Sequence, residues 1–166
     1  MKAPRMLKRK SIDTEKDPYL PKLSPRGMAF CGKCGAIYKG KRWSLGPVAA
    51  APDKKITKVL CPACRKIKDR FPRGFVTIKG SFLKAHKQEM LNLIRNKELR
   101  ACYLNPLERI IKITERNKEI EIQTTTEKLA QRIGQMLKKT FSGNVDYKWS
   151  SDVKLARVLW SRDDGQ

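Results

Sequence analysis

Two pairs of cysteines carry the clearest chemistry in this chain. Cys31-Gly-Lys-Cys34 and Cys61-Pro-Ala-Cys64 share the CxxC spacing, and 26 residues separate the pairs. Two residues between thiols let one tight turn present both sulfur atoms to a single ion. Gly35 can relieve backbone strain after the second cysteine, and Pro62 presets the turn of the second pair. Cys31, Cys34, Cys61 and Cys64 therefore predict one structural Zn²⁺, with no coordination position left for water.

Other cysteine chemistries stay open at this point. One pair could be a redox dithiol, but such a pair normally lies on a strand-to-helix turn, whereas here two matched pairs occupy a basic, loop-rich segment. Iron–sulfur ligation uses the same ligand type. Disulfides are disfavoured in an intracellular chain, because the cytosol keeps thiols reduced. Cys102, the fifth cysteine, is expected to be a small buried hydrophobic residue.

Basic and aromatic side chains surround both pairs. The 166 residues include 38 Lys and Arg against 16 Asp and Glu, a net charge of +22. Residues 31–75 alone carry 12 basic and 2 acidic groups, or +10, which exceeds what solubility needs. Cations neutralise phosphates and rings stack on unpaired bases, so this segment predicts nucleic-acid binding. The candidate contacts are Lys39, Lys41, Arg42, Trp43, Lys54, Lys55, Lys58, Arg65, Lys66, Lys68, Arg70 and Arg73.

A simpler interpretation of these residues is a solvated basic face. For Trp43 taken alone, packing against the zinc module is the favoured alternative to base stacking.

Three segments must position these residues. Residues 1–27, which include four prolines, are predicted to form a basic, flexible tail that orders on a partner or only aids solubility. Residues 28–73 form a zinc-ribbon module built on the four paired cysteines. Residues 74–162 form a small α+β domain.

Alternating strand and helix patterns define that third segment. Strands are predicted at 74–80, 108–115, 118–124, 145–149 and 153–160, and helices at 82–97 and 126–141. The order is β-α-β-β-α-β-β, which predicts a sandwich with helices on one face of a mainly antiparallel sheet. The polar side of the second helix adds Arg132, Lys138 and Lys139 to the candidate nucleic-acid contacts.

Motifs for catalysis do not stand out. His86 is the only histidine, and its helical spacing with Phe82 and Met90 indicates packing rather than acid–base chemistry. Glycine-rich phosphate loops, nucleophile elbows and HExxH are not found. The sequence therefore predicts no enzyme and no small-molecule substrate. Without an apolar run long enough to span a bilayer, we expect a cytoplasmic protein with no membrane partner.

The order of these parts resembles a known family. The two CxxC knuckles, the stretch Ile120–Phe141 and the hairpin from Val145 to Trp160 look like the large-ribosomal-subunit nuclear export adaptor family, first named for nonsense-mediated mRNA decay. The likeness covers roughly residues 28–162. It implies a zinc module joined to a small α+β domain that holds ribosomal RNA. Long eukaryotic members have further CxxC pairs, a barrel domain and transport signals that this chain lacks, so nuclear export is not implied and the chain would be a compact, prokaryotic relative.

These observations predict a zinc-stabilised protein that binds RNA, specifically ribosomal RNA or the large ribosomal subunit, as an assembly or ribosome-associated factor. Three alternatives remain open from sequence. They are a zinc-ribbon DNA-binding regulator, an enzyme of nucleic-acid or thiol metabolism, and an adaptor whose basic tail docks on acidic proteins.

Overall fold

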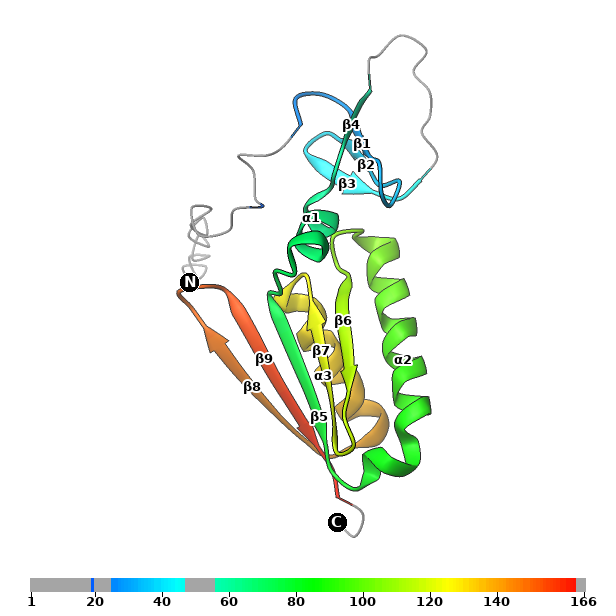
Figure 1. The fold of residues 1–166 in the computed structure, drawn as a ribbon, viewed down its shortest axis with the longest axis vertical. Coiled ribbons are helices and arrows are strands. Elements are labelled where there is room, and N and C mark those ends of the chain that lie inside the picture. Colours follow the sequence, from blue (N-terminus) through cyan, green and yellow to red (C-terminus); the bar gives the residue numbers. More distant parts are fainter. Residues whose placement is uncertain (1–18, 20–24, 47–55, 164–166) are drawn as a thin grey trace, which may run out of the picture.

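Two β-sheets joined by a short helix make up the described part of the chain (Figure 1). The computed structural model describes Tyr19, residues 25–46 and residues 56–163. Most of the predicted tail lies outside these residues, as do Lys54 and Lys55. The α+β class expected from the sequence is confirmed.

The smaller sheet carries the first cysteine pair. Its strands are β1 (Ala29–Cys31), β2 (Ile37–Lys39), β3 (Arg42–Ser44) and β4 (Thr57–Val59), in the order β3-β2-β1-β4. β1 pairs with β2 in antiparallel and with β4 in parallel orientation. The chain then enters helix α1 (Pro62–Asp69), which lies between the two sheets (Figure 1).

The larger sheet has five strands. They are β5 (Gly74–Lys79), β6 (Ile110–Glu115), β7 (Glu119–Thr124), β8 (Asn144–Ser150) and β9 (Leu155–Ser161). The order is β6-β7-β5-β9-β8, and only the central β5–β9 pair is parallel. A parallel pair at the centre requires the chain to cross over one face, and the two long helices make those crossings.

Helices α2 (Phe82–Leu104) and α3 (Glu127–Phe141) pack on one face of this sheet, and in Figure 1 α3 lies behind the strands while α2 stands beside β6. The hydroxyl of Thr126 caps α3 by accepting from the N–H of Leu129 at 3.3 Å. α2 extends beyond the predicted end at residue 97, because buried Ala101 continues its packing. The helix stops where Pro106 follows, since a proline cannot continue the hydrogen-bonding pattern.

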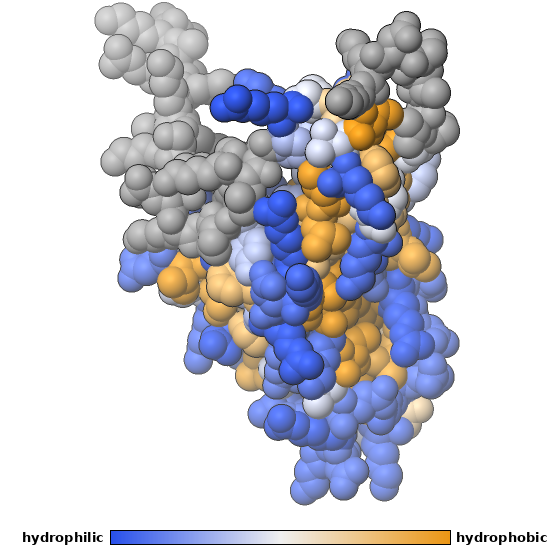
Figure 2. All heavy atoms as spheres, turned by 45° about the horizontal axis from the view of Figure 1, so that its top comes forward, coloured by the Kyte–Doolittle hydropathy of each residue, from blue (hydrophilic) through white to orange (hydrophobic). Residues whose placement is uncertain are grey.

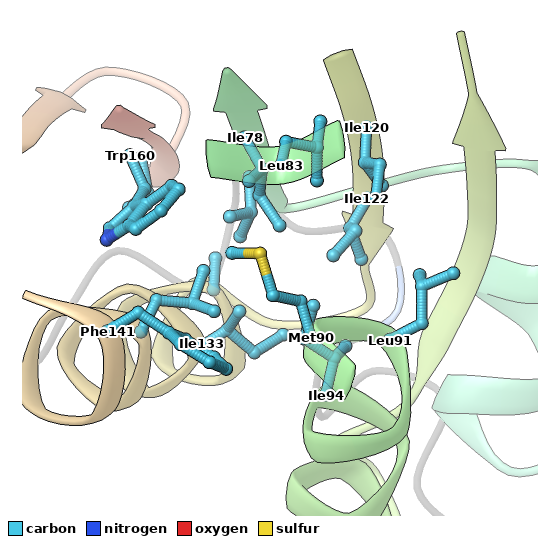
Figure 3. Packing of buried hydrophobic residues seen from close by; sticks show 14 of the residues in the cluster. Ile78, Leu83, Met90, Leu91, Ile94, Ile120, Ile122, Ile133, Phe141 and Trp160 are labelled. Carbon is cyan, nitrogen blue, oxygen red and sulfur yellow. The ribbon is translucent and has the colours of Figure 1, made fainter. Parts of the chain in front are cut away.

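The main core fills the space between the helices and the larger sheet. Strand register brings Ile78 beside Trp160 on β9 and Ile120 on β7, and all three are fully buried. Figure 3 shows Met90 of α2 and Ile133 of α3 pointing toward these strand residues. The indole N–H of Trp160 donates to the carbonyl of Ser142 at 2.8 Å, so its one polar group is satisfied.

Candidate metal centre and nucleic-acid interface

The four paired cysteines meet at one point. Their Sγ atoms all lie within 4.8 Å of one another, and the sulfur atoms of Cys34 and Cys61 are 3.7 Å apart. Cys31 and Cys64 complete the group. Cys34 is half-buried, whereas the other three are buried. The spacing along the chain thus corresponds to one cluster in space.

A tight turn between β1 and β2 holds the first pair. The N–H of Cys31 donates to the carbonyl of Ala36 at 2.7 Å, and the N–H of Gly35 donates to the carbonyl of Cys31 at 2.9 Å. Gly35 has a φ of +74°, a conformation that favours glycine. Glycine after the second cysteine therefore has the backbone role expected from the sequence.

The second pair lies at the start of a helix that the sequence analysis missed. Cys61 is the N-cap of α1, and its sulfur accepts from the N–H of Cys64 at 3.4 Å. Pro62 occupies the first turn, where its missing N–H costs nothing. The N-terminal end of a helix dipole favours negative charge, and the hydrogen bond from the N–H of Cys64 offsets part of the effect of burial on Cys61.

Burial and backbone hydrogen bonds govern the ionisation of the thiols. Burial alone would raise the pKa of Cys31, but the backbone N–H groups of Cys61, Cys34 and Lys33 outweigh it and lower that pKa to about 6. Burial raises the pKa of Cys64 to about 12 and also raises the pKa of Cys61. Neighbouring thiolates add to both increases, because like charges this close repel. A cation among the four sulfurs removes that repulsion.

The arrangement fits a single metal ion. Thiolates 2.3 Å from a tetrahedral ion stand about 3.8 Å from one another, close to the observed Cys34–Cys61 separation. All five cysteines lie in the described part of the chain and are free thiols, so disulfides do not account for the cluster. The residues therefore form a candidate structural metal site with four protein ligands.

Aromatic packing supports the cluster. Trp43 is 7% exposed and its ring centroid lies 5.2 Å from that of Tyr38, on the neighbouring strand. Both rings belong to the small hydrophobic cluster around the cysteines. Trp43 was included among the candidate contacts, but its ring is buried in the module, in agreement with the packing interpretation that the sequence favoured for this residue taken alone.

Many of the predicted basic contacts lie on the surface. Figure 2 shows hydrophilic side chains over much of one face, bordering a band of hydrophobic residues. Arg65 on α1 is half-buried. Two of the exposed predicted contacts, Lys138 and Lys139, lie on α3. The exposed predicted contacts within residues 31–73 are hereafter called the basic surface, and they are Lys39, Lys41, Arg42, Lys58, Lys68 and Arg70.

Three other predicted contacts have partners within the protein. Lys66 is 7% exposed and donates from Nζ to the carbonyl of Thr125 at 3.3 Å, so it joins α1 to the larger sheet. Arg73 is 4% exposed where the chain enters β5. Arg132 forms an ion pair with buried Glu108 at 2.5 Å. Periodicity could not show these tertiary partners. Lys66 and Arg73 are buried and have structural roles, whereas the Arg132 side chain is paired but 42% exposed.

Two features near the centre were missed. Lys33 is exposed between the two cysteines of the first knuckle. Cys102 is half-buried rather than buried, and it lines a cleft of about 450 Å³ that also reaches Cys34 and Cys64. Burial raises the pKa of Cys102, which makes it a weak nucleophile at neutral pH.

His86 and Tyr19 also have defined surroundings. The ring of His86 stacks on Phe82 at 4.0 Å, and its Nδ1 lies 3.1 Å from the carboxylate of Glu89. Tyr19, in the segment predicted as a tail, donates its hydroxyl proton to Asp69 at 2.7 Å. This contact places one residue of that segment against α1.

No family model, curated protein or solved structure matches the chain. Among the described residues, the helices are too short or too polar to cross a membrane.

Proposed function

We propose that this protein is a zinc-stabilised RNA-binding protein that associates with ribosomal RNA of the large subunit, as an assembly or ribosome-associated factor. The observation that carries the proposal is the joining of a four-thiol cluster to the densest basic segment of the chain. Residues 31–75 hold +10 of the total +22 charge. Such a charge density is self-repelling unless a polyanion compensates it.

Zinc is the metal that this donor set favours. Four thiolates in tetrahedral arrangement are typical of structural Zn²⁺, which would fix the two knuckles relative to each other. Cys61 and Cys64 do lie on a strand-to-helix turn, which is the geometry of many redox dithiols. The second pair within 4.8 Å distinguishes this cluster from such a dithiol and favours metal binding.

The basic surface supplies affinity for phosphates. Lys39, Lys41 and Arg42 lie together at the β2–β3 hairpin, and Lys68 and Arg70 lie at the C-terminal end of α1. Ammonium and guanidinium groups neutralise phosphates without reading base sequence, so selectivity would come from the shape of the folded RNA. Lys138 and Lys139 on α3 extend this contribution to the larger domain.

The ribosomal part of the proposal rests on the resemblance described above. A DNA-binding regulator built on the zinc module would need a helix of that module with several exposed base-reading side chains, and of the eight residues of α1 only Lys68 and Asp69 are exposed. An enzyme would need converging catalytic groups, and the single histidine is stacked on Phe82.

A salt titration tests the proposal. Binding of a folded ribosomal RNA fragment should weaken roughly 1,000-fold between about 50 and 200 mM salt, if about six phosphates are neutralised. Gln at Lys39, Lys41 and Arg42 together should reduce the log–log slope by about three. Gln at Lys84, Arg95 and Lys118 removes the same charge from exposed sites elsewhere and serves as the control. A flat titration, or equally tight binding to duplex DNA, would contradict RNA binding.

Sedimentation of cell lysate tests the ribosomal assignment separately. The protein should travel with large-subunit particles at low salt and leave them at high salt. Migration only with free protein under both conditions would contradict association with the ribosome.

A further inference from the structure

One face of the larger sheet is not covered by any helix of the described chain. α2 and α3 both pack on the opposite face, and Figure 1 views the uncovered side. Residues of β5 alternate between the two faces, so Val76 and Ile78 enter the core. Phe75, Thr77 and Lys79 therefore lie on the uncovered face, hereafter the open face.

An aromatic ring and a guanidinium lie together there. Phe75 on β5 is the register partner of Arg157 on β9, and the guanidinium carbon lies 4.8 Å from the ring centroid. Phe75 is half-buried, while Arg157 is exposed. Leu159 follows on the same face of β9 and is 38% exposed. Apolar side chains that lie together on a solvent-facing sheet face, with polar groups around them, can mark a ligand site.

The surface is hollowed at this place. A cavity of about 280 Å³ lies over β5, β9 and β8. Its lining includes Phe75, Arg157, Leu159, Lys148 and Asp146. This volume is just below the range of roughly 300–1,000 Å³ for small-molecule pockets, so the site suits one flat group rather than a large ligand.

Charge on the open face is divided between its two halves. Lys148 and Arg157 lie on the β8–β9 half, against Asp146 alone. Glu119 and Glu121 lie on the β7 half, where Glu119 pairs with Lys79 at 3.2 Å. Lys79 and Lys112, the register partner of Gln123, offset Glu119 and Glu121, so the net positive charge lies on the β8–β9 half and would attract a polyanion there.

We infer that Phe75, Arg157, Leu159 and Lys148 form a platform that binds single-stranded RNA by stacking an unpaired base. Bases stack on aromatic rings and on guanidinium planes, and every base has such a face, so binding tolerates sequence. Lys148 and Arg157 would neutralise the adjoining phosphates. The inference rests on the proposed RNA function, and it assigns the stacking role that buried Trp43 cannot perform.

Phe75, on the platform, lies at the end of the larger sheet that follows α1 (Figure 1), as the second residue of β5. Lys68 and Arg70 lie at that end of α1 and are exposed. One RNA molecule with a folded part and an unpaired end could therefore contact both sites.

Fluorescence anisotropy with a labelled uridine oligoribonucleotide of about eight nucleotides tests the platform, because single-strand sites cover roughly 4–16 nucleotides. Phe75→Ala should weaken binding about 5- to 150-fold, the range for losing one stacked base. Phe75→Tyr should stay within about threefold of wild type, since it keeps the ring. Lys148→Gln should weaken binding and reduce the salt slope by about one.

Tyr103→Ala is the matched control, because Tyr103 is 78% exposed on α2, away from the open face. The inference would be overturned if Tyr103→Ala lost as much affinity for the oligonucleotide as Phe75→Ala, or if Phe75→Ala bound as tightly as wild type. It would also be overturned if the wild type did not bind the oligonucleotide. If Phe75→Ala does not fold, the test rests on the weaker binding expected of Lys148→Gln and on the near wild-type binding expected of Phe75→Tyr. A wild type that binds the oligonucleotide through Phe75 but ignores folded ribosomal RNA would refute the proposed ribosomal function while leaving the platform intact.

Discussion

Replacing Cys61 by Ser should release the metal and unfold the smaller module without unfolding the larger domain. Cys61 contributes twice, as one of the four clustered thiols and as the N-cap of α1. Structural zinc contributes about 10–16 kcal/mol in small zinc modules, so one of four thiolates accounts for roughly 2.5–4 kcal/mol. That corresponds to about a 100- to 1,000-fold loss of zinc affinity.

The packing explains why the module should not survive this loss. Among the buried residues described in the module, Tyr38 and Trp43 are the only large side chains of the cluster around the cysteines. Each large apolar side chain contributes about 1.5–3 kcal/mol on burial. Ordering backbone costs about 1–2 kcal/mol per residue, so two rings cannot hold the module without an ion.

Zinc content by mass spectrometry and hydrogen exchange by segment measure the two effects. In Cys61→Ser, amides of 28–73 should lose protection while amides of α2 and α3 keep it. Cys102→Ser is the matched control, because this cysteine is a free thiol outside the group of four. Retained zinc and protection in Cys61→Ser, or loss of both in Cys102→Ser, would refute the ligand assignment.

Three further predictions concern pH and the larger domain. Zinc affinity should rise at least about 100-fold per pH unit between pH 7 and 8, because binding must release at least two protons. Burial raises the pKa of both Cys61 and Cys64 while the module is folded, and cysteines of an unfolded module have a pKa of about 8.5, so these thiols are protonated without metal in either state. A pH-independent affinity measured by competition with a chelator would contradict this. Glu108→Gln should lower the free energy of unfolding of the larger domain by about 1.5–3 kcal/mol, because the buried carboxylate of Glu108 pairs with Arg132. Lys138→Ala, at an exposed site, is the control and should change it by less than about 0.5 kcal/mol. Denaturant titrations measure both changes. Gly80→Ala should lower the melting temperature, because Gly80 has a φ of +114° and an added Cβ would meet the carbonyl oxygen of Arg162. Gly46→Ala, with open space around the added Cβ, should leave the melting temperature unchanged.

The spacing of the cysteines predicted the cluster, and the alternation of apolar and polar residues predicted strands of the larger sheet. Both patterns depend on local backbone geometry. A CxxC turn brings its two sulfurs together whatever surrounds it. Ile120 and Ile122 alternate with polar residues because one face of β7 packs in the core. The cluster and the α+β class therefore followed from sequence.

Helix α1 was missed because it has only eight residues and lies in a basic, loop-rich segment, although Ala63, Cys64 and Ile67 do follow helical spacing. Pro62 in the first turn, after a capping residue, was the available signal. The buried cations were missed for a different reason. Lys66 contacts Thr125, 59 residues later, and Arg132 pairs with Glu108, 24 residues earlier. Contacts between distant segments leave no local pattern.

Trp43 lies among cations in the sequence, which suits base stacking, but packing in the zinc module was the favoured interpretation of this residue taken alone. Pairing of β2 with β3 sets it beside Tyr38 in the module. The open face supplies a ring in its place, and strand alternation alone could have placed Phe75 opposite the core residues Val76 and Ile78.

The most direct test of the account is the affinity for a folded ribosomal RNA fragment before and after zinc is removed with a chelator. A short uridine oligoribonucleotide serves as the internal reference. The account predicts that removal of zinc weakens binding of the folded fragment at least about tenfold, because the basic surface loses its fixed geometry, and changes oligonucleotide binding much less. Equal affinity for the folded fragment with and without zinc would contradict the central claim.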